Sequence, residues 1–270
     1  MVAAMPVVSS PAETEGPVLE TSGLGIRFGG HAAVDDVSCA FRPGTLTAIV
    51  GPNGAGKTTY FNLVSGQLRA SAGRVLLFGE DVTTLSAAER TRRGVGRAFQ
   101  LTNLFPNLTV IENVRLAVQS HARLGLDLIS MWSSHRALIE KAEHYLHRVA
   151  LADRRHQIAA SLPHGDQRKL EVAILLALEP DIMMLDEPTA GMSVDEVPVI
   201  LEIIHGVKAE REKTILLVEH KMDVVRSLAD RIVVLHQGRL VADGLPQEVI
   251  ASPIVQEAYL GVAKGGGPGG

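Results

Sequence analysis

The segment Gly51–Thr58 constrains the fold of this chain more than any other feature. It reads Gly-Pro-Asn-Gly-Ala-Gly-Lys-Thr and fits the pattern G-x-x-x-x-G-K-[ST] in full. The apolar run Leu46–Val50 precedes it, and a helical pattern follows from Lys57 to about Gly66. A strand that turns through glycines into a helix aims backbone N–H groups and a helix N-terminus at one point. The sequence therefore predicts a phosphate-binding loop.

The loop residues have expected roles in holding a nucleoside triphosphate. We expect Lys57 to bridge the β- and γ-phosphates and Thr58 to ligate Mg²⁺. The residues that we expect around the phosphates are Gly51, Pro52, Asn53, Gly54, Ala55, Gly56, Lys57, Thr58 and Thr59. The alternative is a tight glycine turn with an incidental lysine, and the flanking strand and helix favour the phosphate loop.

Polar residues follow two further apolar runs that we predict to be buried strands. Ile182–Leu185 leads into Asp186 and Glu187, and Thr214–Val218 leads to His220 after one glutamate. We expect Asp186 to hold Mg²⁺, directly or through water, and Glu187 to orient and polarise the attacking water. We expect His220 to hydrogen-bond the γ-phosphate. A solvated acidic loop and a structural histidine are the alternatives, and the phosphate loop favours the catalytic interpretation.

Short β-rich runs alternate with helical patterns, which predicts an α/β fold. From about Thr109 to Leu162 the pattern is helical, which indicates a helical subdomain inserted into the α/β core. Gln100 lies where the core passes into this insert. Its amide can touch Mg²⁺ or water and so couple the two parts, whereas a plain polar linker residue is the alternative.

Composition and charge exclude several function classes. The net charge of −4 over 270 residues argues against a general nucleic-acid binder, which needs a basic face. One cysteine allows no internal disulfide. No run of 18 apolar residues and no secretory signal are present, so we expect no membrane span within the chain. Residues 1–16 are predicted to be a disordered arm and 264–270 a flexible tail.

Taken in order, these segments resemble the ATPase subunits of ABC transporters from about Val18 to Gly261. The segments that match are the phosphate loop, Gln100, a signature-like Leu162–Gln167, the acid pair and His220. The resemblance implies a P-loop NTPase fold with a mixed central sheet, an antiparallel β edge and an inserted helical subdomain. The ATPase domain would span 17–263, with a RecA-like core at 17–98 and 168–250 and helices at about 99–167.

The family resemblance also implies ATP and Mg²⁺ as cofactors and adds site residues. Phe28, before Gly29 and Gly30, would stack on adenine, and an ordinary core phenylalanine is the alternative. Gln100 would contact the Mg²⁺ site. Gly165, in the signature, would face the γ-phosphate bound by a second ATPase subunit.

A closer resemblance is to the ATPases of branched-chain amino-acid importers. The supporting segments are Phe28–Gly30, Arg97–Leu101, Phe105–Asn113, His164–Glu171, Ala190–Met192 and Ala258–Gly261. This implies a peripheral subunit at the cytoplasmic face of the inner membrane that powers uptake through permease subunits, with an indirect link to a solute-binding protein. Urea-type and lipopolysaccharide-export ATPases share much of the pattern. A soluble ABC ATPase acting on DNA or ribosomes and a phosphate-loop kinase are the remaining alternatives.

The signature departs from the family pattern. Pro163 replaces a serine whose hydroxyl binds the opposite γ-phosphate, His164 replaces a glycine, and Asp166 replaces a glutamine. Ser193 stands where the loop after the acid pair carries an aspartate. We therefore expect unequal sites in a heterodimer with a different ATPase chain. The alternative is that Gly165 N–H groups and the following helix N-terminus suffice.

Overall fold

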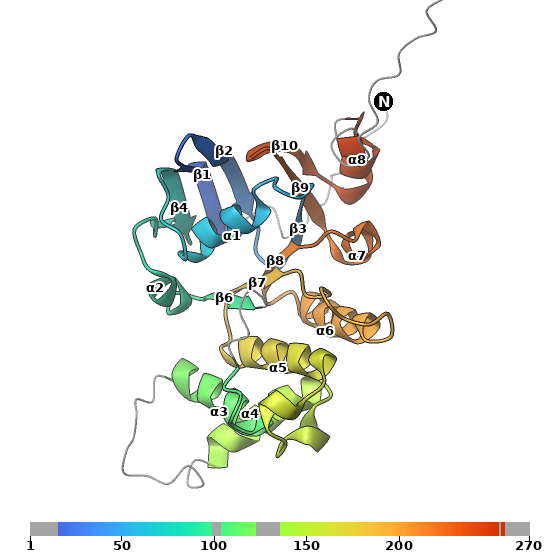
Figure 1. The fold of residues 1–270 in the computed structure, drawn as a ribbon. Coiled ribbons are helices and arrows are strands. Elements are labelled where there is room, and N and C mark those ends of the chain that lie inside the picture. The colour runs from blue at the N-terminus through green and yellow to red at the C-terminus, as the bar shows by residue number, and fades with distance from the viewer. Residues whose placement is uncertain (1–15, 99–103, 123–135, 254, 257–270) are drawn as a thin grey trace, which may run out of the picture.

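The structure is a computed structural model that describes residues 16–98, 104–122, 136–253 and 255–256. Strands and helices alternate along most of this length, as expected (Figure 1). The strands are β1 (Leu19–Phe28), β2 (His31–Phe41), β3 (Leu46–Val50), β4 (Ala72–Leu77), β5 (Glu80–Asp81), β6 (Val95–Ala98), β7 (Ile182–Asp186), β8 (Thr214–Val218), β9 (Arg231–His236) and β10 (Arg239–Gly244). The helices are α1 (Lys57–Ser65), α2 (Ala87–Thr91), α3 (Val110–His121), α4 (Arg136–Arg148), α5 (His164–Ala177), α6 (Val197–Glu210), α7 (Met222–Leu228) and α8 (Pro246–Ala251).

A six-stranded sheet in the order β10-β9-β3-β8-β7-β6 forms the centre of the core. Its pairs are parallel except β9 with β10, which are antiparallel, so the expected mixed central sheet is confirmed. All residues of β3, β7 and β8 are buried, which explains why these strands are continuous apolar runs in the sequence. Because parallel strands end at the same edge, the polar residues after β3, β7 and β8 meet there.

A second sheet, in the order β2-β1-β4-β5, is wholly antiparallel and is the expected β edge. Helix α1 packs between the two sheets, with Tyr60 and Phe61 fully buried against side chains of both. The two-residue β5 pairs with β4 and is the outermost strand on that side of the sheet. The antiparallel sheet thus packs against α1, the helix that follows the phosphate loop.

The helical part consists of α3, α4 and α5, which pack on one another below the core (Figure 1). Helix α3 begins at a capping box: Thr109 Oγ1 accepts from the Glu112 N–H, and the Glu112 carboxylate accepts from the Thr109 N–H. The expected boundary at 167/168 falls inside α5, whose apolar face packs against α3 and α4 and the core sheet. Within the described ranges, no helix is both long and apolar enough to cross a bilayer.

Candidate functional site

The phosphate loop lies between β3 and α1, as the sequence predicts. Gly54 and Gly56 have φ angles of +78° and +96°, which side chains other than glycine rarely adopt. The Ala55 N–H donates to the Pro52 carbonyl at 3.1 Å, and the Gly238 N–H donates to the Ala55 carbonyl at 3.0 Å. The turn between β9 and β10 therefore supports the loop from behind and fixes its curvature.

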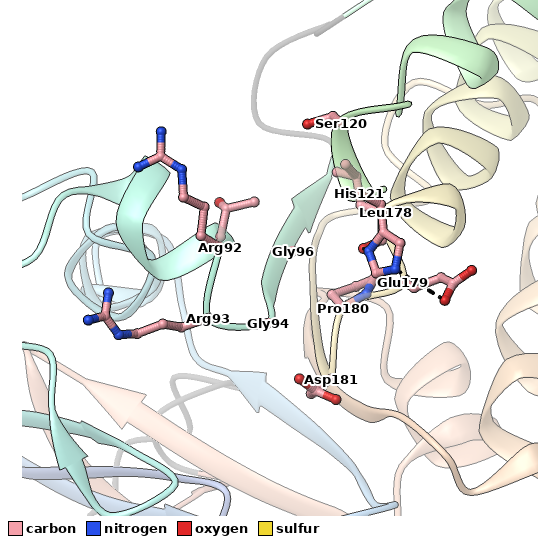
Figure 2. Close-up of a pocket in the computed structure, with 11 residues that line it drawn as sticks. Arg92, Arg93, Gly94, Gly96, Ser120, His121, Leu178, Glu179, Pro180 and Asp181 are labelled. Atoms are coloured by element: carbon pink, nitrogen blue, oxygen red, sulfur yellow. Dashed lines mark hydrogen bonds and ion pairs between the residues drawn. The ribbon is translucent and has the colours of Figure 1, made fainter. Parts of the chain in front are cut away.

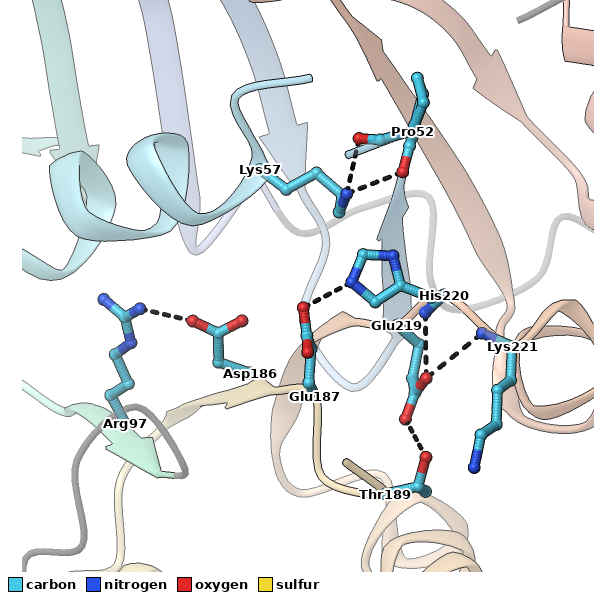
Figure 3. A network of polar contacts seen from close by, with 10 residues as sticks. Pro52, Lys57, Arg97, Asp186, Glu187, Thr189, Glu219, His220 and Lys221 are labelled. Atoms are coloured by element: carbon cyan, nitrogen blue, oxygen red, sulfur yellow. Dashed lines mark hydrogen bonds and ion pairs between the residues drawn. The ribbon is translucent and has the colours of Figure 1, made fainter. Parts of the chain in front are cut away.

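Lys57, the first residue of α1, is 5% exposed and turns back over the loop. Its Nζ donates to the carbonyls of Gly51 at 2.7 Å and Pro52 at 3.0 Å (Figure 3). Burial lowers the pKa of Lys57, and the nearby carboxylates of Glu187 and Asp186 oppose that shift. The ammonium group is thus held over the loop that we expect to receive phosphates.

Gly56→Ala is expected to destabilise the fold by about 2 kcal/mol or more, because the new side chain is strained at this φ and meets backbone atoms. A Cβ at this position would lie 2.4 Å from the Ala33 carbonyl oxygen. The matched control is Gly206→Ala in α6, where a Cβ meets nothing within 4 Å. That change should stabilise by about 0.5–1 kcal/mol. Urea unfolding of both variants measures the difference, and equal midpoints would contradict this account.

The acid pair ends β7 at the same sheet edge as the loop. Asp186 is the last residue of the strand, and Glu187 follows with a φ of +53°. The Glu187 N–H donates to the Val218 carbonyl at 2.9 Å, so the turn is fixed to the end of β8. A left-handed glutamate is strained, and such strain collects at functional sites.

His220 reaches Glu187 from the next strand, β8. Its Nε2 lies 2.5 Å from Glu187 Oε1, with both side chains more than one third exposed (Figure 3). The neighbouring Glu219 is buried, and its carboxylate accepts from Thr189 Oγ1 at 2.6 Å and from the His220 N–H at 3.0 Å. Glu219 thus anchors the segment that presents His220. Sequence reasoning assigned no role to it, and a charged residue directly after a buried strand was the available signal.

A cavity of about 220 Å³ joins the loop to these residues. Its wall is formed by His31, Ala33, Asn53, Gly54, Ala55, Gly56, Lys57, Thr58, Thr59, Glu187 and His220. The structure therefore brings together the expected loop residues with Glu187 and His220, although they are spread over three strands. A polyphosphate seated there would meet backbone N–H groups, the ammonium group of Lys57, the carboxylate of Glu187 and the imidazoles of His31 and His220.

Asp186 does not line this cavity, and its carboxylate has a partner that the sequence did not indicate. Arg97 Nη2 donates to Asp186 Oδ2 at 2.7 Å, and each side chain is 7% exposed. Burial raises the pKa of Asp186, and the guanidinium of Arg97 opposes that shift. One threonine hydroxyl and one carboxylate, completed by phosphate and water oxygens, still fit a magnesium site, since Mg²⁺ takes few protein ligands and only oxygen.

The other expected residues lie apart from the cavity or outside the described residues. Phe28 ends β1 with 52% of its surface exposed, and its register partner His31 belongs to the cavity wall. Gly165 lies in the first turn of α5, away from this wall. Gln100 falls within 99–103, outside the described residues.

A larger cavity of about 830 Å³ lies elsewhere, between the start of β6 and the ends of α3 and α5 (Figure 2). Polar side chains, among them Arg92, Arg93 and His121, line it. None of the expected nucleotide-site residues lines it. The larger cavity is therefore not the candidate nucleotide site.

Comparison with known proteins agrees with the geometry around the loop. The family model described as ABC transporter matches residues 34–190, which contain the phosphate loop and the acid pair. The chain belongs to the ABC transporter family. A second model, described as branched-chain amino acid ATP-binding cassette transporter, matches residues 239–264.

Several relatives resemble this ABC ATPase over nearly its full length. The high-affinity branched-chain amino acid transport ATP-binding protein LivG of Escherichia coli K12 is 38% identical, covering 92% of the chain and 99% of LivG. The high-affinity branched-chain amino acid transport ATP-binding protein BraF of Pseudomonas aeruginosa is 39% identical, covering 92% of the chain and 99% of BraF. A crystal structure of the ADP conformation of an ATP-binding cassette superposes with a TM-score of 0.78 at 29% identity, covering 91% and 99% of the two chains.

Membership of the ABC transporter family confirms the resemblance predicted from the sequence motifs, and it confirms the P-loop ABC ATPase fold that the resemblance implies. Like its family, this ABC ATPase is an ATP hydrolase that works within a transport system. In the described part of the structure, the phosphate loop, Glu187 and His220 converge at the 220 Å³ cavity.

Proposed function

We propose that this chain binds ATP with Mg²⁺ at the 220 Å³ cavity and hydrolyses it to power import of branched-chain amino acids through a permease. The observation that carries the proposal is the convergence of the phosphate loop with Glu187 and His220. Three separate segments supply these groups, and a mere glycine turn would need neither acid nor imidazole beside it.

In the proposed reaction each residue acts at a stated place. The N–H groups of the loop and Lys57 Nζ hold the phosphate oxygens, and Lys57 offsets the charge that develops on the γ-phosphate. Glu187 orients a water molecule in line with that phosphate, and His220 donates to a γ-phosphate oxygen. Thr58 and Asp186 would hold Mg²⁺, which supplies charge neutralisation. Phe28, which is exposed beside the cavity, would stack on adenine.

The substrate proposal rests on the relatives. LivG and BraF are described as branched-chain amino acid transport proteins, and a model of that subfamily matches the C-terminal part of this chain. Transport of urea or another small solute, and lipopolysaccharide export, are the competing functions. The chain would attach to the cytoplasmic face of the membrane through permease subunits, and a solute-binding protein would select the substrate.

We also propose that the second ATPase subunit is a different chain. Gly165 would present to the γ-phosphate on that subunit the N–H that bonds the Glu196 carboxylate in this structure, and Pro163, two residues before it, has no N–H to add. Asp166 is paired with Arg154 at 2.6 Å and Lys169 at 2.8 Å, so its carboxylate is held within its own subunit. The signature of this chain thus offers fewer donors than a serine-containing one.

Uptake by reconstituted vesicles tests the proposal. The chain is co-purified with its candidate permease and second ATPase, and ATP-driven uptake of labelled leucine, urea and a lipid substrate is compared. Leucine uptake that unlabelled isoleucine and valine compete away is the expected result. Uptake of urea alone, or ATP hydrolysis without association with any permease, would overturn the substrate or the transport assignment respectively.

A further inference from the structure

Arg97 lies at a junction of three elements that build the candidate site. Its Nη2 donates to Asp186 Oδ2 at 2.7 Å, as described above. Its Nη1 donates to Asn62 Oδ1 at 2.7 Å and to Ser65 Oγ at 2.9 Å, and its guanidinium lies 5.3 Å from the centre of the Phe61 ring. The Arg97 side chain is 7% exposed, so these contacts are largely shielded from solvent.

The contacts of Arg97 connect the two elements that carry the proposed metal-site residues. Thr58 lies in the first turn of α1, and Asn62, Phe61 and Ser65 lie further along the same helix. Asp186 ends β7, which pairs in parallel with β6, the strand of Arg97. A helix and a neighbouring strand share no backbone ladder, so their spacing depends on side chains such as this one.

The geometry points to Arg97 as a positioning residue for the metal site, through the second carboxylate oxygen of Asp186. Oδ2 is held by Arg97, and the other oxygen points away from it (Figure 3). The hydrogen bonds of Arg97 to α1 on one side and to Asp186 on the other then set the separation between that oxygen and Thr58. This inference rests on the proposed use of Mg²⁺ at Thr58 and Asp186.

Arginine suits this role because its planar fork donates in several directions at once, whereas lysine supplies a point charge. Arg97→Lys therefore keeps the positive charge beside Asp186 and removes the hydrogen bonds from the guanidinium to Asn62 and Ser65 of α1. Outer groups that orient metal ligands typically change metal affinity by about 10- to 100-fold when they are replaced. A residue that only packs the core would change stability without this selective effect.

The test measures metal-dependent binding of a nucleotide without hydrolysis. A fluorescent ADP analogue is titrated into the full chain, once with Mg²⁺ and once with EDTA. In wild type Mg²⁺ should tighten binding. In Arg97→Lys we expect this tightening to fall by about 10-fold or more, with the affinity in EDTA unchanged. The matched control is Arg148→Lys, which alters the ion pair with Glu210 between α4 and α6, and it should behave as wild type.

Two results would overturn the positioning role. One is an unchanged effect of Mg²⁺ in folded Arg97→Lys, and the other is an equal loss of affinity with and without Mg²⁺. If that variant does not fold, Asn62→Ala removes one anchor of Arg97 and should give a smaller loss of the Mg²⁺ effect, whereas no loss would overturn the inference. Failure of wild type to bind the nucleotide, or indifference of wild type to Mg²⁺, would instead overturn the proposed function, and the inference with it.

Discussion

Glu187→Gln is expected to lower the rate of ATP hydrolysis by about 10²–10⁴-fold and to leave ATP binding intact. The amide has the size of the carboxylate and can still bond His220, which lies 2.5 Å from Glu187 Oε1. It cannot accept a proton from the attacking water or polarise it with a negative charge. Binding should persist because the phosphate contacts come from the loop and Lys57. Phosphate release and equilibrium ATP binding, measured on the same preparation, separate the two effects.

The matched control for this prediction is Glu202→Gln, which removes the same charge from an exposed position on α6. It should hydrolyse ATP at the wild-type rate. Hydrolysis by Glu187→Gln at more than a tenth of the wild-type rate, a change of under about 1.4 kcal/mol in the barrier, would remove Glu187 from the role of water-orienting base.

Lys57→Met is expected to abolish most hydrolysis and, unlike the Glu187 variant, to weaken binding of the triphosphate as well. Removing one charge-stabilising donor from such a site typically lowers the rate by about 10²–10³-fold. Lys57 is nearly buried, so an apolar side chain of similar length avoids the cost of burying a charge. The change also removes the two hydrogen bonds that Lys57 Nζ donates to the carbonyls of Gly51 and Pro52, which costs about 1–3 kcal/mol. The variant should therefore fold, with a free energy of unfolding no higher than that of wild type.

The control for this variant is Lys213→Met, directly before β8 at the edge of the sheet opposite the loop. Its ATP binding and hydrolysis should match those of wild type. The comparison of ATP with ADP is diagnostic, because contact of Lys57 with the γ-phosphate requires a larger loss for ATP. Equal losses for the two nucleotides would place the ammonium group on the β-phosphate alone.

The sequence predicts those parts of this site whose conformation is determined by a single short segment of the chain. The phosphate loop and the ends of β7 and β8 each combine an apolar run with particular polar or glycine residues. Such a segment carries its own conformational preference, so Gly56, Glu187 and His220 lie where the sequence places them. The convergence of those segments follows from the parallel arrangement of their strands.

The parts that the sequence does not predict depend on the order of strands in the sheet. Arg97 meets Asp186 because β6 is the neighbour of β7, and no local pattern encodes that adjacency. Glu219 contacts Thr189 across two loops for the same kind of reason.

The central position of β3 has a consequence for how the chain is made. Its two neighbours in the sheet are β8 and β9, which the ribosome produces long after the phosphate loop. At roughly 5–20 residues per second, β3 remains without either neighbour for on the order of 10 s. During that interval an apolar strand has both edges open to aggregation. A message cut short before β8 would therefore yield a chain that carries the full phosphate-loop motif but lacks both neighbours of β3 and His220.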